Sequence, residues 1–260
     1  VDGSQGRYDE IVRDLETLGL ADLRAIPVSA LTGDNVVAPT ENMPWYEGPC
    51  LLDHLETLEV ESDRNLEARR FPVQWVIRPM STEYPDFRGY AGTVAGGVWR
   101  AGDEVVVLPS GHRSRVETID VDVAIPGESV TIQLADDIDV SRGDMLADPE
   151  NAPTVARELE ARLCWMSERP LEPRAKLAIK HTSRTVRAIV DELVSVVDIS
   201  TLEDRPAPEK LELNDIAVVR LRLSEPLAVD PYADSRETGA FILIDEATND
   251  TVAAGMVTSA

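Results

Sequence analysis

The segment at residues 26–36, Ile-Pro-Val-Ser-Ala-Leu-Thr-Gly-Asp-Asn-Val, combines residue types and spacing that suit ligand binding. The apolar residues before it predict a strand over 23–28, so Ser29 and Ala30 begin the loop at the carboxyl end of that strand. Open α/β sheets bind their ligands at this edge. A Ser-Ala-Leu step alone is common by chance, so the interpretation also depends on the Gly-Asp-Asn-Val that follows it. We interpret Ser29, Ala30 and Leu31 as a ligand-binding loop.

Other residues that could do chemistry lack the necessary spacing. His54, His112 and His181 fall in three different predicted domains and share no spacing for a metal site or an acid/base pair. The Asp-Asp-Ile-Asp run at 136–139 lacks the pattern of a calcium loop and predicts a solvated turn. Neither a Gly-x-x-x-x-Gly-Lys-Ser/Thr phosphate loop nor an Asn-Lys-x-Asp motif occurs. The sequence therefore predicts no catalytic residue and no metal site in this chain.

A second candidate site is the long excursion at residues 78–88 between two predicted strands. Arg78, Tyr84 and Phe87 in this loop have side chains suited to protein contacts, and such loops often carry recognition. An ordinary surface connection is the alternative. We treat these three residues as candidate partner contacts.

The elements around the ligand loop predict part of an α/β domain over residues 1–60. Apolar residues at helical spacing indicate a helix over 8–19, and a second helix is predicted from Pro49 with four leucines on one face. One strand and two helices cannot complete a doubly wound sheet, so we expect the rest of the domain to precede Val1 in the intact protein. Charged residues 61–70 then predict a linker.

From Phe71 onward the sequence predicts strands. One set covers 71–150, with strands expected at 71–77, 88–94, 104–108, 115–121 and 129–134 and a closing piece at 144–148. A second set covers 155–257, with strands expected at 159–165, 175–181, 185–197, 215–223, 239–245 and 251–257. The fold class predicted is mainly β: two consecutive antiparallel β-barrels after an α/β remnant. Residues 198–210 predict an exposed connection.

Charge and cysteine usage limit the partners and the compartment. The formal net charge of −23 would repel nucleic acid and anionic membranes, so neither is an expected partner. Cys50 and Cys164 lie far apart in apolar contexts, which suits reduced thiols in a cytosol. No apolar run approaches the length of a membrane span, and the first residues do not resemble a secretory leader. We expect a cytoplasmic protein.

The motifs together closely resemble the GTPase subunit of bacterial sulfate adenylyltransferase. The glycine-punctuated stretch at 89–108 is shared with the barrel of translation-factor-type GTPases, whereas four further runs are more specific. These runs are Val-Ser-Ala-Leu-Thr-Gly-Asp-Asn-Val at 28–36, Met-Pro-Trp-Tyr-Glu-Gly-Pro at 43–49, Phe-Pro-Val-Gln-Trp-Val-Ile-Arg-Pro at 71–79 and Phe-Arg-Gly-Tyr-Ala-Gly at 87–92.

The resemblance implies a P-loop GTPase domain followed by two barrels, with a smaller catalytic sulfate adenylyltransferase subunit as partner. Ser29, Ala30 and Leu31 match the loop that contacts guanine in this family, while the remaining contacts to GTP and Mg would come from residues absent here. ATP and sulfate would bind the partner. GTP hydrolysis would drive formation of adenylyl sulfate and pyrophosphate in sulfate assimilation and cysteine biosynthesis. Some relatives carry an adenylyl-sulfate kinase fused at the carboxyl end.

Two alternatives remain. An elongation-factor-like GTPase would use the same barrels to bind aminoacylated RNA, but its barrel surfaces should then be basic, and this chain is acidic. A non-catalytic assembly fragment, whose barrels only dock a partner, is compatible with the first reading. The fragment alone is expected to be inactive.

Overall fold

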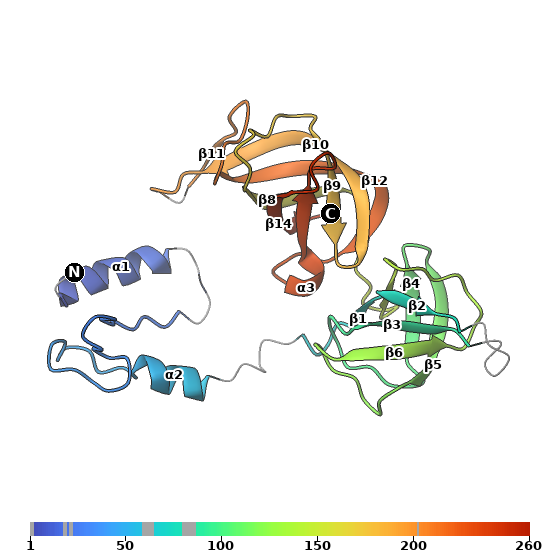
Figure 1. Ribbon diagram of the computed structural model, residues 1–260, viewed down its shortest axis with the longest axis horizontal. Helices are drawn as coiled ribbons and strands as arrows, with labels where there is room; N and C mark the ends of the chain where they lie inside the picture. Colours follow the sequence, from blue (N-terminus) through green and yellow to red (C-terminus); the bar gives the residue numbers. More distant parts are fainter. Residues whose placement is uncertain (1–2, 18–19, 21–22, 59–64, 80–86, 202) are drawn as a thin grey trace. The chain divides into compact units, whose positions relative to one another are not determined.

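The computed structural model describes residues 3–17, 20, 23–58, 65–79, 87–201 and 203–260. The chain divides into two units, Val1–Asp63 and Arg64–Ala260. The first unit holds two helices, and the second holds all fourteen strands of the described residues together with one short helix (Figure 1). The predicted mainly β class is confirmed, because the second unit consists of two antiparallel, seven-stranded sheets.

The first unit consists of α1 (Gln5–Glu16), an irregular segment and α2 (Leu51–Thr57). α1 begins and ends three residues earlier than the predicted helix. Tyr8 holds α1 to the irregular segment, because its hydroxyl donates to the Ala25 carbonyl at 3.0 Å and its ring lies 5.1 Å from the Trp45 ring. The indole N–H of Trp45 donates in turn to the Gly3 carbonyl at 3.0 Å.

Residues 23–28 do not form the strand that the sequence predicts. β-Pairing begins only at Ser29, which forms an isolated bridge with Asp34. A strand requires a neighbour to bond its backbone groups. None of the described residues of the first unit supplies such a neighbour for residues 23–28.

The first barrel contains seven strands in the order β1-β7-β4-β5-β6-β3-β2. Their bounds are β1 Arg70–Pro72, β2 Trp75–Ile77, β3 Gly89–Thr93, β4 Glu104–Leu108, β5 His112–Ile119, β6 Ser129–Leu134 and β7 Met145–Ala147. An antiparallel bridge between Arg70 and Gly96 brings β1 back to the chain after β3. Large buried side chains fill the interior, among them Phe71, Tyr90, Trp99, Ile132 and Leu146.

The predicted strand at 71–77 is split into β1 and β2, because the chain changes partners between them. β1 pairs with β7, and β2 pairs with β3. At the break, the Val73 amide donates to the Asp144 carbonyl at 2.8 Å, while the Gln74 amide donates to the Ala91 carbonyl at 2.9 Å. Trp75, the first residue of β2, is 65% exposed, although a tryptophan within an apolar run predicts a core side chain.

The second barrel also has seven strands, in the order β11-β10-β12-β8-β14-β13-β9, and it closes through pairing of β9 with β10. Their bounds are β8 Thr154–Trp165, β9 Lys176–His181, β10 Arg184–Val197, β11 Asp204–Pro206, β12 Ile216–Val229, β13 Ala240–Ile244 and β14 Thr251–Ser259. Its interior is one apolar cluster that includes Leu159, Leu163, Ile179, Leu221 and Leu243.

Two short elements were not predicted. β11 pairs with the end of β10, within the segment expected to be an exposed connection, and its three residues are indeed exposed. α3 (Arg236–Gly239) is a single turn that is N-capped by Ser235, whose hydroxyl accepts a hydrogen bond from the Thr238 amide at 3.4 Å. Three or four residues are too few for a periodic apolar signal.

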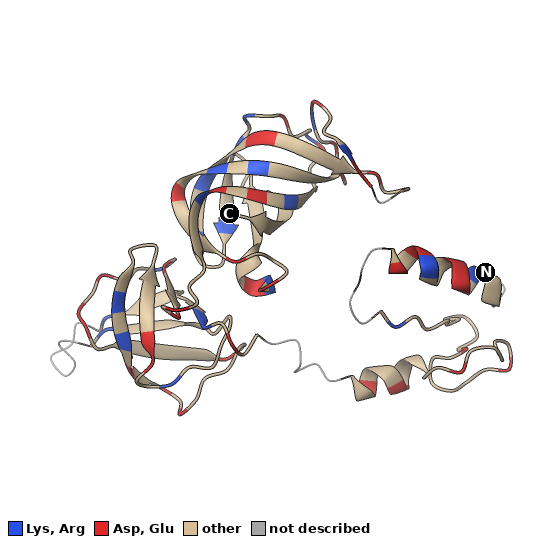
Figure 2. Ribbon diagram, turned by 180° about the vertical axis from the view of Figure 1, so that it is seen from behind, with Lys and Arg blue, Asp and Glu red and all other residues tan. Residues whose placement is uncertain are grey.

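Acidic and basic residues are interspersed along the strands of both barrels (Figure 2). None of the helices in the described part of the chain has the length and apolar character needed to cross a membrane.

Candidate functional site

The Ser29 loop is a tight turn closed by its own backbone. The Ser29 amide donates to the Asp34 carbonyl at 3.2 Å, and the Gly33 amide donates to the Ser29 carbonyl at 2.8 Å. Gly33 has a φ of 79°, a conformation that glycine adopts without a Cβ clash. Ala30 and Leu31 form the exposed tip, and the Leu31 side chain is 95% exposed.

The tip presents two backbone donors. The amides of Ala30 and Leu31 donate to no acceptor among the described residues, whereas the Thr32 amide donates to the Ser29 hydroxyl at 3.4 Å. Unpaired N–H groups in a row suit a carbonyl or ring oxygen of a ligand. Ser29, Ala30 and Leu31 lie in one tight turn, although the strand predicted before it is absent, and their ligand role stays a prediction.

Asp34 fixes the shape of the loop through its carboxylate. It accepts hydrogen bonds from the hydroxyls of Thr32 and Thr40 and, at 3.0 Å, from the side-chain amide of Asn42. These bonds, with Thr32 the strongest, hold the pKa of the Asp34 carboxyl below its usual range. The Asp34 carboxylate is therefore ionised at neutral pH, and its hydrogen bonds hold Thr32, Thr40 and Asn42 around it.

Asn35 ties the loop to α2 and is the residue whose role the sequence analysis missed. It is only 3% exposed and has a φ of 54°, which asparagine tolerates better than most residues. Its side-chain amide donates to the Pro27 carbonyl at 3.0 Å and accepts from the Thr40 amide at 3.2 Å. Its carbonyl accepts from the Leu51 amide at 2.9 Å, at the start of α2. The Gly-Asp-Asn order after the loop was the available signal.

A cavity of about 680 Å³ lies beside the loop, within the first unit. α1 supplies an apolar wall, and Ser29 and Asp34 stand at the polar side. The wall residues on α1 are Tyr8, Ile11, Val12 and Leu15. This size falls within the range of small-molecule sites, which are mostly apolar with a few placed polar groups.

The candidate partner loop at 78–88 is only partly described. Arg78 is exposed at the end of β2, and Phe87 is half-buried before β3, where its ring packs against Gly89. Tyr84 lies outside the described residues. Arg88 anchors the returning chain, because its guanidinium pairs with Asp137 at 2.5 Å.

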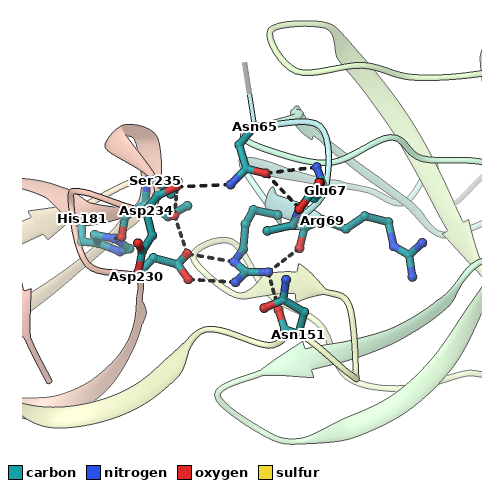
Figure 3. Close-up of polar contacts among 11 residues, drawn as sticks. Asn65, Glu67, Arg69, Asn151, His181, Asp230, Asp234 and Ser235 are labelled. Carbon is teal, nitrogen blue, oxygen red and sulfur yellow. Dashed lines mark hydrogen bonds and ion pairs between the residues drawn. The ribbon is translucent and has the colours of Figure 1, made fainter. Parts of the chain in front are cut away.

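The two barrels meet at a buried ion pair (Figure 3). Arg70, at the start of β1, is 3% exposed and donates through Nε and Nη2 to the two carboxylate oxygens of Asp230, each at 2.8 Å. Its Nη1 donates to the Asn151 carbonyl at 2.7 Å. The Thr238 hydroxyl donates to the same Asp230 carboxylate at 2.6 Å. A bidentate, fully bonded pair of this kind fixes orientation as well as distance.

Further contacts extend this joint. The Ser183 hydroxyl donates to the Val73 carbonyl at 2.8 Å, and Arg184 pairs with Asp144 at 3.0 Å. Ala228 of the second barrel joins an apolar cluster that is otherwise formed by the first barrel. The other members of that cluster are Val106, Leu108, Met145 and Ala147.

The three histidines do not form a site. His181 is buried near the joint, where its Nε2 lies 2.7 Å from the Thr238 carbonyl and burial lowers its pKa. His54 lies on α2 and His112 on β5, so the three side chains belong to different elements. Across the described residues, no three histidine, cysteine or carboxylate side chains gather in a way that could hold a metal ion.

Comparison with known proteins shows which family this architecture and these motifs come from. The chain is 49% identical over 255 residues to the bifunctional enzyme CysN/CysC of Mycobacterium tuberculosis, and 46% identical over 266 residues to sulfate adenylyltransferase subunit 1 of Bacteroides fragilis. These alignments cover 96% and 99% of this chain. The chain is a homologue of sulfate adenylyltransferase subunit 1. The homology confirms the resemblance drawn from the sequence motifs.

The chain spans about half the length of these relatives: 42% of the Mycobacterium tuberculosis protein and 55% of the Bacteroides fragilis protein. Residues 158–258, almost the whole second barrel, match the GTP-eEF1A C-terminal domain-like family. Crystal structures of Sup35 complexed with GMPPNP and with GDP share the fold, each with a TM-score of 0.68 and 22% identity. They cover 99% and 100% of this chain, which matches 66% of each Sup35 chain.

Proposed function

We propose that this chain belongs to the GTP-dependent regulatory subunit of sulfate adenylyltransferase. The observation that supports the proposal is homology along 96–99% of the chain to proteins named CysN/CysC and sulfate adenylyltransferase subunit 1. The complete protein would couple hydrolysis of GTP to the reaction of ATP with sulfate, which yields adenylyl sulfate and pyrophosphate. Coupling is required because the sulfate–phosphate anhydride is unfavourable to form.

In this proposal the Ser29 loop binds the guanine base. The free amides of Ala30 and Leu31 would donate to the exocyclic carbonyl oxygen of guanine, and the small Ala30 side chain would allow the ring to approach the backbone. Asp34 and Asn35 would position the loop through the bonds described above. The Sup35 crystal structures, complexed with GMPPNP and with GDP, support nucleotide binding in this fold.

This chain would not carry out GTP hydrolysis alone. Its sequence contains no phosphate loop, and a base-contacting loop without phosphate and Mg²⁺ contacts supplies little of the binding free energy. Phosphate and Mg²⁺ would be held by residues of the complete protein that are absent here. ATP and sulfate would bind a smaller catalytic subunit, in keeping with the relatives' name "subunit 1". The CysN/CysC relatives suggest that a kinase is fused in some members.

The two barrels would transmit the nucleotide state to the partner. A nucleotide switch works only if the partner binds one conformation of the protein more tightly than the other. The partner therefore needs different contacts in the two nucleotide states. The buried Arg70–Asp230 pair and the apolar cluster at Ala228 would make the barrels respond as one body.

The guanine contact is tested by substituting Ala30 in the complete protein. Ala30→Val adds two methyl groups at the loop tip and should weaken GTP binding at least about tenfold, which corresponds to about 1.4 kcal/mol. Val37→Ala is the matched control, because Val37 is 65% exposed in the same irregular segment and has no role in the proposed site. Equilibrium titration with GTP measures both. An unchanged dissociation constant in a folded Ala30→Val protein would contradict the assignment.

A further inference from the structure

The outer surface of the second barrel changes character between its two sides. Outward side chains of β12 are charged and paired with those of its neighbours β8 and β10: Arg220 lies 3.2 Å from Glu160 and 2.7 Å from Glu192, and Arg222 lies 3.4 Å from Asp191. Such pairs are the ordinary solvated surface of a soluble sheet. The outward positions of β13 and β14 depart from this pattern.

An apolar row crosses five neighbouring strands at one level of the barrel. Ile242 on β13 is paired with Lys180 on β9 and with Ala254 on β14. Ala254 is paired with Cys164 on β8, which is paired with Ile216 on β12. Since side chains alternate between the faces of a strand and the flanking Leu243, Ala253 and Leu163 fill the interior, these residues face outward. One cation and four apolar side chains therefore form a continuous row.

A second row lies beside the first and completes a groove. Met256 on β14 is paired with Ala240 on β13 and with Arg162 on β8. Ala254 occupies the centre of the first row and Ala240 one end of the second, so larger neighbours rise around them. The resulting groove has a volume of about 600 Å³ and is lined mostly by apolar atoms, with Tyr232 among its lining residues. A concave apolar surface of this kind on a sheet usually marks a contact site.

The charges at the groove define the chemistry of its occupant. Lys180 is exposed and forms no ion pair with any described residue, and Arg162, which is 43% exposed, pairs with the half-exposed Asp204 at 3.5 Å. Of the described residues that line the groove, none carries a carboxylate. In a chain with a formal charge of −23, a groove with two cations and no anion is complementary to an acidic partner group.

We propose that this groove binds an apolar segment of the catalytic subunit that carries a carboxylate side chain. The apolar side chains of the segment would cover Ile242, Ala254 and Met256, and its carboxylate would reach Lys180 or Arg162 at the rim. The inference rests on the proposed function only in requiring a partner subunit. Its location follows from the register of the strands and the charges of the rim.

Four variants of the complete protein test the proposal by titration against the separately purified catalytic subunit. Ile242→Asp places a carboxylate in the apolar row, and Lys180→Glu reverses the rim charge. Their controls are Ile189→Asp, an outward isoleucine on β10, and Lys176→Glu, an exposed lysine at the start of β9; neither control lines the groove. Thermal melts and GTP titration establish that all four variants remain folded.

The expected result is a loss of partner affinity of at least about tenfold in Ile242→Asp and Lys180→Glu, with both controls within about twofold of the parent. Equal affinity of all four variants for the catalytic subunit would overturn the proposed role of the groove while leaving the proposed function intact. A Lys176→Glu effect as large as that of Lys180→Glu would also overturn it, because only the net charge would then matter. Failure of the parent itself to bind the catalytic subunit, or to form adenylyl sulfate with it, would instead reject the proposed function.

A small apolar anion is the competing occupant. The fluorescent probe 8-anilinonaphthalene-1-sulfonate distinguishes it, since a docking surface is covered in the complex and a small-molecule pocket is not. Displacement of the probe by the catalytic subunit supports the proposal. Probe binding that is lost in Ile242→Asp but unaffected by saturating catalytic subunit would overturn it.

Discussion

At the scale of single residues, polar side chains behind the Ser29 loop hold its backbone in shape. The exposed amides of Ala30 and Leu31 are the proposed contacts, whereas Asp34 and Asn35 hold the loop from behind. A buried asparagine at a φ of 54° satisfies both a donor and an acceptor there. The sequence predicts Ser29, Ala30 and Leu31 as a ligand loop, but it does not reveal the supporting bonds, because they connect residues up to sixteen positions apart.

The pKa of Asp34 gives the first test at this scale. Hydrogen bonds from Thr32 and Thr40 lower it in the folded chain, so these bonds stabilise the fold above the carboxyl's unfolded pKa of 3.8, and the contribution is lost as the pH falls through the lower folded pKa. Carbon-detected NMR titration should therefore find Asp34 titrating below 3.8. Thr40→Val should move this pKa upward, because one of the bonds disappears.

Thr57→Val is the control for this titration. The Thr57 hydroxyl donates to the Asp53 carbonyl on α2 and has no bond to the Asp34 carboxylate. An Asp34 pKa that stays in place in Thr40→Val, or that shifts equally in Thr57→Val, would show that the threonine bonds do not set it.

At the scale of elements, the joint between the barrels is the feature with the largest expected energetic effect. Removing one partner of a buried, bidentate pair leaves an uncompensated charge, so Arg70→Met should reduce the free energy of unfolding by about 3–5 kcal/mol. The double variant Arg70→Met/Asp230→Asn should cost less than the sum of its two single variants. Urea denaturation of the 260-residue chain, followed by circular dichroism, measures these differences.

The control for the joint is Arg220→Met on the outer surface of the second barrel. Arg220 is 55% exposed between two glutamates, so its loss should change the free energy of unfolding little. If Arg70→Met proved no more destabilising than Arg220→Met, the buried pair would not hold the barrels together.

At this scale, how well a strand can be predicted depends on which other strand it pairs with. β4 and β6 were predicted with their observed bounds, because β4 is an apolar run and β6 alternates polar and apolar residues, each between clear turns. The run at 71–77 was predicted as one strand, yet its halves bond to different neighbours, which no local pattern reveals. Residues 23–28 have strand composition but no neighbour among the described residues to pair with. The strands that were predicted correctly differ from residues 71–77 and 23–28 in long-range pairing more than in β-propensity.

Trp75 shows the same limit for burial. A tryptophan in an apolar run predicts a core side chain, but the first residue of β2 points to the outside of the barrel. Since side chains alternate with period two, the break between β1 and β2 determines which face Trp75 occupies.

At the scale of the whole molecule, net charge distinguishes the proposed function from the elongation-factor alternative. An RNA-binding factor depends on phosphate contacts, and a chain with a formal charge of −23 opposes them. The chain should therefore show no binding of aminoacylated transfer RNA in filter assays, even at low salt where electrostatic attraction is strongest. Saturable binding that weakens steeply with added salt would favour the elongation-factor alternative.

The coupled reaction tests the central claim most directly. The complete protein is mixed with the catalytic subunit, ATP and sulfate, and adenylyl sulfate is measured with GTP, with non-hydrolysable GMPPNP and without guanine nucleotide. We predict that adenylyl sulfate accumulates together with GDP in the presence of GTP, and far less in the other two conditions. Accumulation that is equal with and without GTP, or that occurs without the catalytic subunit, would contradict the account.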